Sequence, residues 1–269
     1  MRIAAIQMRS GTDLEANLEA AGALIRRAAD GGASFVATPE MTHILQRSPK
    51  RLFAQLTPQS HARTIAYFSD LAKELSIDLL IGSLAVKTGP ARAANRAFLF
   101  DKTGKASAQY DKIHLFDVQV SRKETWRESN VYDRGEQAVL ADINGAKLGL
   151  SICYDLRFGA LYRHYAQRGA QIMAVPAAFT VPTGLAHWEP LLRARAIETG
   201  SFIIAPAQGG AHEDGRTTWG RSMIVGPWGD IIAQSHDDAP AIITADIDIE
   251  AAARARQKIP AWNHNPVFS

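Results

Sequence analysis

The chain has 269 residues, of which 46% are hydrophobic and 21% charged, so it is long enough for a globular fold with a large core. The net charge is only +3, no block of about five like charges occurs, and no run approaches the ~20 apolar residues of a membrane span, which disfavours nucleic-acid and membrane partners. One cysteine rules out a disulfide within the chain, and the first residues lack the apolar core of a signal peptide, so we expect a cytoplasmic protein.

Short apolar runs recur along the chain and predict β-strands. Each is bounded by Gly, Pro, Asp or Asn and holds roughly four to eight core residues, the usual length of a buried strand. The segment IVGPWGDII predicts two strands joined by a tight turn. The runs span residues 2–8, 34–40, 78–86, 96–101, 147–155, 171–178, 201–208, 222–234 and 241–247.

Amphipathic helices are predicted between several of these strands. In residues 13–30, apolar side chains recur at steps of three and four, and Thr12 and Glu15 have the spacing of a capping box. Further helices are predicted at 60–76, from Gly159 to Arg168, and in a segment that ends near Thr199, where Pro190 fits only the first turn.

This order of elements indicates an α/β fold. Strands that are apolar on both faces need cover on both sides, so we expect two facing mixed sheets with helices outside, a four-layer α-β-β-α sandwich. No repeat or Pro/Ser-rich linker divides the chain, which predicts a single domain over 1–269 with a C-terminal tail from about 250 to 269. In that tail, Trp262, Val267 and Phe268 fit either an interface with a second copy or a packed tail.

The stretch GLSICYDLRFG, residues 149–159, contains the only cysteine, Cys153. A lone cysteine is commonly a small buried hydrophobe. Here an apolar strand runs directly into a predicted helix, which places the side chain at the carboxyl end of a sheet and the following backbone N–H groups, beginning at Tyr154, where they can bind an oxyanion. Ser151 lacks the G-x-S-x-G context of a serine nucleophile and is interpreted as part of the strand.

A nucleophilic cysteine needs a base, because only a few per cent of a free thiol is ionised near neutral pH. None of the eight histidines has a cysteine-protease context, and their scattered spacing predicts no metal site. Glu40 ends the apolar run SFVATPE, where a carboxylate is costly unless it has a partner or a function. Lys112 lies between acidic residues in YDKIHLFD. Taken alone, each is equally compatible with an ordinary structural or surface role.

Together, ATPEM around Glu40, YDKIHLF around Lys112 and SICYDLRF around Cys153 resemble the nitrilase superfamily of carbon–nitrogen hydrolases, which carries a Glu-Lys-Cys triad in this order. The likeness runs from RIAAIQM to the last predicted strand. The segment HEDGRTTWGRSM resembles the Nit branch, which contains omega-amidases and amidases of deaminated glutathione. Departures from the family pattern lie outside the triad, at Gly159-Ala160, Pro190 and Gly226.

The resemblance implies that the protein hydrolyses linear amides through a cysteine thioester and releases ammonia, without a metal or organic cofactor. It implies that Glu40 exchanges protons with Cys153, and that Lys112 and the Tyr154 N–H hold the oxyanion. Glu128, in TWRESNVY, matches the second glutamate of the family and would orient Lys112 or the substrate.

Two further residues are implied substrate contacts. Arg157 could bind a carboxylate remote from the scissile bond, and an ion pair with Asp155 or another acid is the alternative. Thr183 matches a substrate-contact segment of the family, and a helix cap is the alternative.

The expected substrate is a small amide, with deaminated glutathione first. The alternatives are an omega-amidase acting on α-ketoglutaramate or α-ketosuccinamate, an N-carbamoyl amino acid amidohydrolase, and, outside enzymes, a catalytically silent binding protein. The family also implies a homodimer or a higher homo-oligomer.

Overall fold

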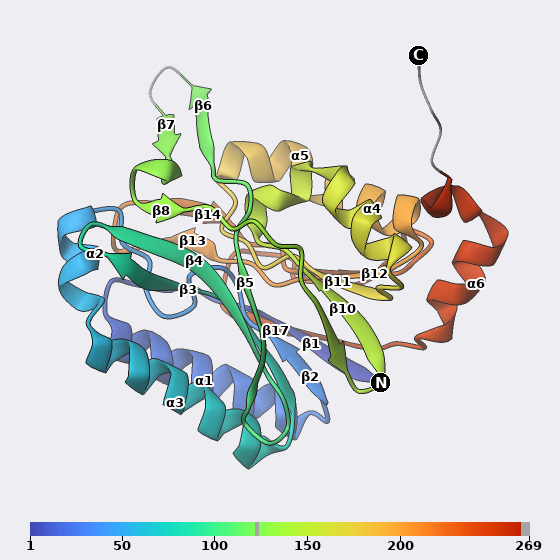
Figure 1. The fold of residues 1–269 in the computed structure, drawn as a ribbon, viewed down its shortest axis with the longest axis horizontal. Coiled ribbons are helices and arrows are strands. Elements are labelled where there is room, and N and C mark those ends of the chain that lie inside the picture. The colour runs from blue at the N-terminus through green and yellow to red at the C-terminus, as the bar shows by residue number, and fades with distance from the viewer. Residues whose placement is uncertain (122–123, 265–269) are drawn as a thin grey trace.

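The computed structural model describes residues 1–121 and 124–264, and its described strands form two large sheets and two small hairpins (Figure 1). In spatial order, the first sheet contains β17 (Ala241–Asp246), β1 (Arg2–Gln7), β2 (Phe35–Ala37), β3 (Asp78–Gly89), β4 (Arg92–Phe100) and β5 (Ala106–Asp111), with β8 (Tyr132–Asp133) beside β4. The second contains β16 (Ile231–Gln234), β15 (Met223–Val225), β12 (Phe202–Ala205), β11 (Ile172–Ala174), β10 (Ala146–Leu150) and β9 (Leu140–Ile143). The hairpins are β6 (Asp117–Ser121) with β7 (Glu124–Arg127), and β13 (Gly209–Ala211) with β14 (Thr217–Trp219).

Both large sheets are mixed. The neighbours β1, β2 and β3 run parallel in the first sheet, and β10, β11 and β12 run parallel in the second, whereas the flanking large-sheet strands pair antiparallel, except for β8. The predicted tight turn in IVGPWGDII joins β15 to β16, where the Gly226 N–H donates to the Asp230 carbonyl at 2.8 Å. That prediction is confirmed.

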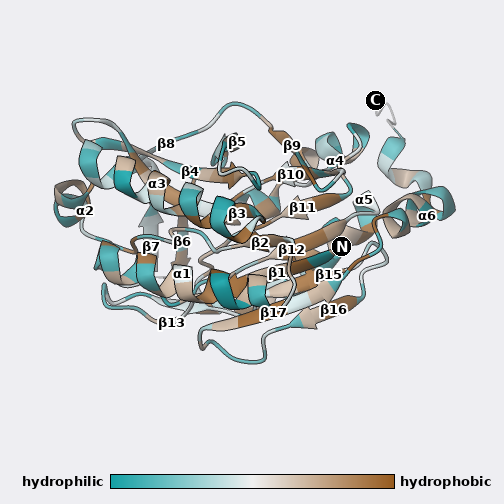
Figure 2. Ribbon diagram, turned by 90° about the horizontal axis from the view of Figure 1, so that it is seen from below, coloured by the Kyte–Doolittle hydropathy of each residue, from teal (hydrophilic) through white to brown (hydrophobic). Residues whose placement is uncertain are grey.

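Alternation along the strands builds the layers. On β1, Ile3 and Ala5 face a core shared with the second sheet, whereas Ala4 and Ile6 face the helix side of the first sheet. All four are fully buried, as a strand covered on both faces requires. The four-layer α-β-β-α prediction is therefore confirmed, and Figure 2 shows hydrophobic strands inside and hydrophilic residues on the outer helices.

Six α-helices and three short 3-10 helices occur in the described residues. Helices α1 and α3 cover the first sheet, and α4 and α5 cover the second (Figure 1). Their bounds are α1 (Leu14–Asp30), α2 (Pro49–Gln55), α3 (Pro58–Leu75), α4 (Gly159–Gln167), α5 (Val181–Thr199) and α6 (Glu250–Lys258), with η1 (Glu128–Asn130), η2 (Cys153–Arg157) and η3 (Pro260–Asn263).

Two local predictions were wrong. Asp13, not Thr12, caps α1, because its side chain accepts from the Ala16 N–H while the Thr12 hydroxyl donates to Glu213. Pro190 lies inside α5 rather than in its first turn. Its ring is exposed and the residue four positions earlier, Ala186, is exposed too, so the carbonyl that loses its helical partner lies on the solvent side.

The C-terminal segment packs onto the body of the molecule through α6 and η3. Trp262 is half-buried against the main core, and the Arg256 guanidinium lies 5.0 Å from its ring centroid. The alternative of a packed tail thus applies to Trp262, whereas Val267 and Phe268 lie outside the described residues. Within the ranges that the structure describes, no helix is long and apolar enough to cross a membrane.

Candidate active site

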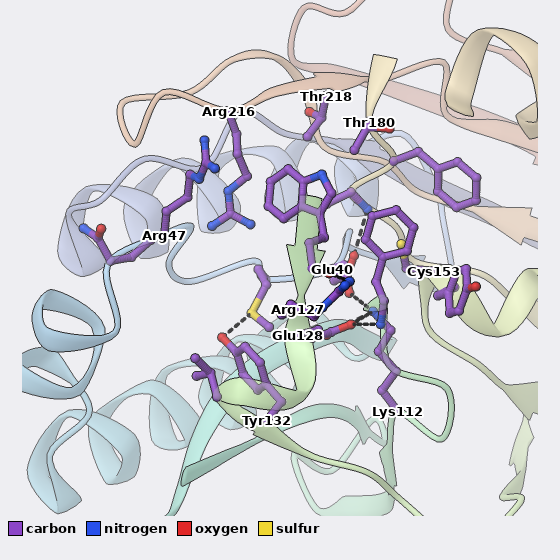
Figure 3. Close-up of a pocket in the computed structure, with 18 of the residues that line it drawn as sticks. Glu40, Arg47, Lys112, Arg127, Glu128, Tyr132, Cys153, Thr180, Arg216 and Thr218 are labelled. Atoms are coloured by element: carbon purple, nitrogen blue, oxygen red, sulfur yellow. Dashed lines mark hydrogen bonds and ion pairs between the residues drawn. The ribbon is translucent and has the colours of Figure 1, made fainter. Parts of the chain in front are cut away.

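The three residues of the expected triad meet at one end of the sandwich. Glu40 follows β2, Lys112 follows β5 and Cys153 follows β10, so each side chain leaves a strand near its carboxyl end. All three line one cavity of ≈ 340 Å³ (Figure 3). That volume is in the range of small-molecule sites.

Glu40 is 5% exposed, and the polar groups that contact its carboxylate are hydrogen-bond donors. Oε1 accepts from Lys112 Nζ at 2.9 Å and from Asn95 Nδ2 at 2.8 Å, and Oε2 accepts from the Ala178 N–H at 2.9 Å. Burial raises the pKa of Glu40, but the Lys112 charge and the hydrogen bonds outweigh burial and hold the pKa below its ordinary value. The carboxylate is therefore ionised at neutral pH.

Lys112 bridges two carboxylates. Its Nζ is within 2.9 Å of Glu40 Oε1 and 2.8 Å of Glu128 Oε2, and the side chain is 2% exposed. Burial lowers the pKa of Lys112, but the charges of Glu128 and Glu40 raise it well above its ordinary value. Glu128 is itself fixed by the Phe116 N–H, which donates to Oε2 at 2.7 Å. Lys112 therefore remains a cation that is held in place from two sides.

Cys153 occupies a strained backbone position. Its φ of 50° lies in the left-handed region, which non-glycine residues rarely adopt, and its N–H donates to the Pro176 carbonyl at 2.9 Å. The thiol forms a hydrogen bond with Glu40. Burial, and then the charge of Glu40, raise the pKa of the thiol well above its ordinary value. The resting group is thus a neutral thiol beside an ionised carboxylate.

The residue after Cys153 supplies a backbone donor. Tyr154 is the second residue of η2, lines the same cavity, and its N–H finds no acceptor among the described residues. The first N–H groups of a helical turn have no partner within that turn. Tyr154 and Lys112 therefore bring a backbone donor and an ammonium group to the same cavity.

Asp155 ties the elbow at Cys153 to the segment that carries Lys112. Its carboxylate accepts from the Ile152 N–H at 2.9 Å, from the Tyr110 hydroxyl at 2.7 Å and from the His114 N–H at 2.9 Å. The side chain is fully buried. These contacts join residues on either side of Lys112 to residues on either side of Cys153. The hydrogen-bond partners of Asp155 among the described residues do not include Arg157, so the alternative of an ion pair between these two residues does not hold.

Asn95 is a site residue that sequence reasoning missed. It is fully buried on β4, and Nδ2 donates to Glu40 Oε1 and, at 3.1 Å, to Glu128 Oε1. Its backbone carbonyl accepts from the Lys112 N–H at 3.0 Å. The available signal was an asparagine inside the apolar run AANRAFLF, because a buried amide needs partners.

The two expected substrate contacts differ in position. Thr183 lines the cavity and its hydroxyl contacts the Thr180 hydroxyl at 2.8 Å, while Thr180, not Thr183, is the N-cap residue of α5. Arg157 is not among the residues that line the cavity. Its guanidinium lies 5.8 Å from the Tyr154 ring centroid and 5.7 Å from that of Phe179, behind two side chains that do line it.

Comparison with known proteins gives the family. The family described as carbon-nitrogen hydrolase matches residues 2–257. The chain is 38% identical over 265 residues to the deaminated glutathione amidase of Synechocystis sp. (strain PCC 6803 / GT-S), covering 97% of this chain and 96% of that protein. It is 35% identical over 263 residues to the omega-amidase NIT2 of Homo sapiens, covering 97% and 93%. The solved structure of the Caenorhabditis elegans NitFhit protein is similar with a TM-score of 0.91 and 36% identity, covering 98% of this chain and 64% of that longer one.

The chain therefore belongs to the carbon–nitrogen hydrolase family, as the three motifs implied. It is an enzyme of the amidase class, and its similar proteins fall in the Nit branch.

Proposed function

We propose that this enzyme hydrolyses linear amides through a thioester on Cys153. One observation carries the proposal: the buried Lys112 ammonium bridges Glu40 and Glu128 directly beside the Cys153 thiol. A neutral thiol, an ionised base and a fixed cation are the groups that such a reaction needs.

In the first half of the reaction, Cys153 Sγ bonds to the amide carbonyl carbon while the thiol proton passes to Glu40. The negative charge that develops on the carbonyl oxygen is stabilised by Lys112 and the Tyr154 N–H. The carbon–nitrogen bond then breaks, and Glu40 gives its proton to the departing nitrogen. The acyl group remains on sulfur as a thioester.

In the second half, Glu40 takes a proton from water as the water oxygen attacks the thioester carbonyl. The tetrahedral adduct collapses to a carboxylic acid, and the proton returns to Cys153. Positioned proton transfer raises the reaction rate about 10²–10⁴-fold, and an oxyanion donor raises it about 10²–10³-fold. The reaction therefore needs both the proton-transferring group and the oxyanion donors. Glu128 holds Lys112 in place, and Thr183 and Arg157 remain proposed substrate contacts.

As substrate we propose deaminated glutathione, which the name of the similar Synechocystis enzyme supports. The name of the similar human omega-amidase supports the alternative of α-ketoglutaramate or α-ketosuccinamate. An N-carbamoyl amino acid amidohydrolase is a third possibility within the superfamily. A silent binding protein is disfavoured, because every group of the proposed mechanism is present.

An activity panel tests this proposal. Wild type is assayed with deaminated glutathione, α-ketoglutaramate and an N-carbamoyl amino acid, beside Cys153→Ala. We expect turnover of at least the first substrate by wild type, none by the variant, and unchanged circular dichroism. Mass spectrometry with a slow substrate should find the acyl adduct on the Cys153 peptide. Wild-type rates in the variant, or an adduct elsewhere, would reassign the nucleophile.

We also propose that the enzyme forms a homodimer or a higher homo-oligomer through a surface where large apolar side chains are exposed. Trp228 in the β15–β16 turn is 58% exposed, Ile197 on α5 is 53% exposed and Ile259 after α6 is 52% exposed. Exposed apolar groups of this size commonly mark an interface. Light scattering of wild type should give twice the monomer mass or a higher multiple of it, and Trp228→Glu should lower it; a monomeric wild type would contradict the proposal.

The remaining expectations are a single domain over 1–269 and a cytoplasmic location. A core that joins both sheets supports the first, and the free thiol of Cys153 suits the reducing cytoplasm. A single cooperative unfolding transition and fractionation of cells would test them.

A further inference from the structure

Met41, the residue after Glu40, has a backbone torsion angle that residues other than glycine rarely adopt. Its φ is 54°, in the same left-handed region as the φ of 50° at Cys153. Such a position persists only where its surroundings hold it. On one side, the Met41 N–H donates to Ser83 Oγ at 2.9 Å. The contacts that hold Met41 also determine where the adjacent Glu40 carboxylate lies.

The segment that carries Glu40 is buried but lies outside the helices and strands. Glu40, Met41 and Thr42 are all buried, so their carbonyls need hydrogen-bond donors from other segments. Gln208 Nε2 donates to the Glu40 carbonyl at 3.0 Å and to the Met41 carbonyl at 3.4 Å. The Ser10 hydroxyl accepts from Gln208 Nε2 at 2.7 Å and donates to the Thr42 carbonyl at 3.0 Å. One pair of side chains therefore provides the donors for three consecutive carbonyls.

Gln208 also binds the segment that holds the carboxylate of Glu40. It follows β12 of the second sheet, and its N–H donates to the Ala177 carbonyl at 2.8 Å. The next N–H along that segment, that of Ala178, donates to Glu40 Oε2 at 2.9 Å. The Gln208 side chain is fully buried and is not among the residues that line the cavity. Its effect on the chemistry must therefore pass through Glu40.

We propose that Gln208 is a positioning residue for Glu40. Its carboxamide holds the strained turn at Met41, and that turn aims the Glu40 carboxylate at the Cys153 thiol. The inference rests on the proposed amide hydrolysis, in which Glu40 takes the thiol proton. Proton transfer needs a carboxylate oxygen within hydrogen-bond reach of the thiol, and a turn that relaxes toward ordinary torsion angles moves that oxygen away.

The chain offers a matched control for this glutamine. Gln7, at the end of β1, is also fully buried, and its carboxamide also bonds to distant segments. Its Nε2 donates to the Asp237 and Ala239 carbonyls at 2.9 Å and 2.6 Å, and its Oε1 accepts from the Ser222 N–H at 2.9 Å. Among the described residues, none of these partners belongs to a segment that carries a triad residue.

Gln208→Met and Gln7→Met are compared first by steady-state kinetics, because methionine fills nearly the space of glutamine and cannot donate a hydrogen bond. Gln208→Met should lower kcat about tenfold and leave KM within about twofold, since the amide does not touch the substrate. Gln7→Met should leave kcat within about twofold, although both variants lose buried hydrogen bonds. Equal losses of kcat in the two variants would reduce Gln208 to a structural residue.

A second readout follows the thiol alone. Iodoacetamide alkylates Cys153, with loss of iodide and transfer of the thiol proton to Glu40. In wild type the rate should be nearly constant through neutral pH, because the ionised Glu40 removes the proton. In Gln208→Met the rate at pH 7 should be lower and should rise with pH, because the thiol must ionise without a positioned base. A pH profile equal to that of wild type would overturn the role of Gln208.

Met41→Gly tests whether Gln208 acts through the turn. Glycine adopts a positive φ without strain, so the loss of kcat caused by Gln208→Met should shrink from about tenfold to about threefold in this background. An equal loss in both backgrounds would overturn this route. Should Gln208→Met fail to fold, Gln208→Asn takes its place, because its amide is one methylene farther from the carbonyls. If wild type hydrolyses no amide, the proposed function fails, whereas the alkylation profiles still decide the role of Gln208.

Discussion

Lys112→Met gives the sharpest test of the buried charge cluster. Methionine has nearly the length of lysine and no charge, so the variant fills the same space and removes the cation from between Glu40 and Glu128. In the native protein Nζ is 2.9 Å from Glu40 Oε1 and 2.8 Å from Glu128 Oε2, and the side chain is 2% exposed. The variant therefore leaves two facing carboxylates without a counter-charge.

Two magnitudes follow from this geometry. Loss of one oxyanion donor lowers kcat about 10²–10³-fold. Removal of one partner from a buried ion pair lowers the free energy of unfolding by about 3–5 kcal/mol. For a chain of this length, each kcal/mol shifts Tm by about 2–4 °C, so the expected loss is on the order of 10 °C.

The pH dependence of stability should also change sign. In the native protein the pKa of Glu40 is lowered, so its contribution to stability is present above its ordinary pKa of 4.5 and is lost as pH falls. In Lys112→Met, burial and the nearby Glu128 carboxylate raise the pKa of Glu40 above its ordinary value, so stability falls as pH rises through the raised pKa. The gap in Tm between wild type and variant should thus be larger at pH 8 than at pH 5.

Thermal melts followed by circular dichroism at pH 5 and pH 8, with initial rates at both, measure these effects. Lys105→Met is the control, because Lys105 is exposed in the turn between β4 and β5. A Tm gap that is the same at both pH values, or a kcat within tenfold of wild type, would refute the role assigned to the Lys112 charge.

Three further predictions concern single side chains. Asn95→Ala removes donors from Glu40 and Glu128, so kcat should fall about tenfold and the acid limb of the pH–rate profile should move to higher pH; an unmoved limb would leave Asn95 a purely structural residue. Arg157→Lys should raise KM for acidic amides more than for neutral ones, and equal effects would remove its proposed contact. Pro190→Ala should restore a helical hydrogen bond and raise the free energy of unfolding by about 1–2 kcal/mol, and an unchanged Tm would contradict this.

The hydrophobic pattern within each segment predicted the layers of this fold well, because the residues of a strand themselves indicate which of its faces are buried. On β1, Ile3 and Ala5 face one core while Ala4 and Ile6 face the other. This alternation follows from strand geometry and does not depend on which strands are neighbours. Predictions that depended on a single side-chain hydrogen bond were less accurate than predictions of strands. The cap of α1 depended on whether Thr12 bonds its own helix or Glu213, which is 201 residues away.

Glu40, Lys112 and Cys153 were found through three motifs, but their partner Asn95 was not. Asn95 reaches Glu40 and Glu128 only because β4 pairs with β3 and β5 in one register, and that register is set by contacts between distant segments. The sequence could signal a buried amide that needs acceptors, but not which carboxylates would accept.

The arginines illustrate why nearness in sequence to a nucleophile is a weak guide to which side chains line the cavity. Arg157 is four residues from Cys153, yet its guanidinium lies behind Tyr154 and Phe179. Arg47 precedes α2 and Arg216 precedes β14, yet both line the cavity, and both guanidiniums lie over the ring of Trp126 on β7. The triad residues follow strand ends, whereas Arg47 and Arg216 lie on connecting segments, where residues can change without disturbing the strands that hold the triad.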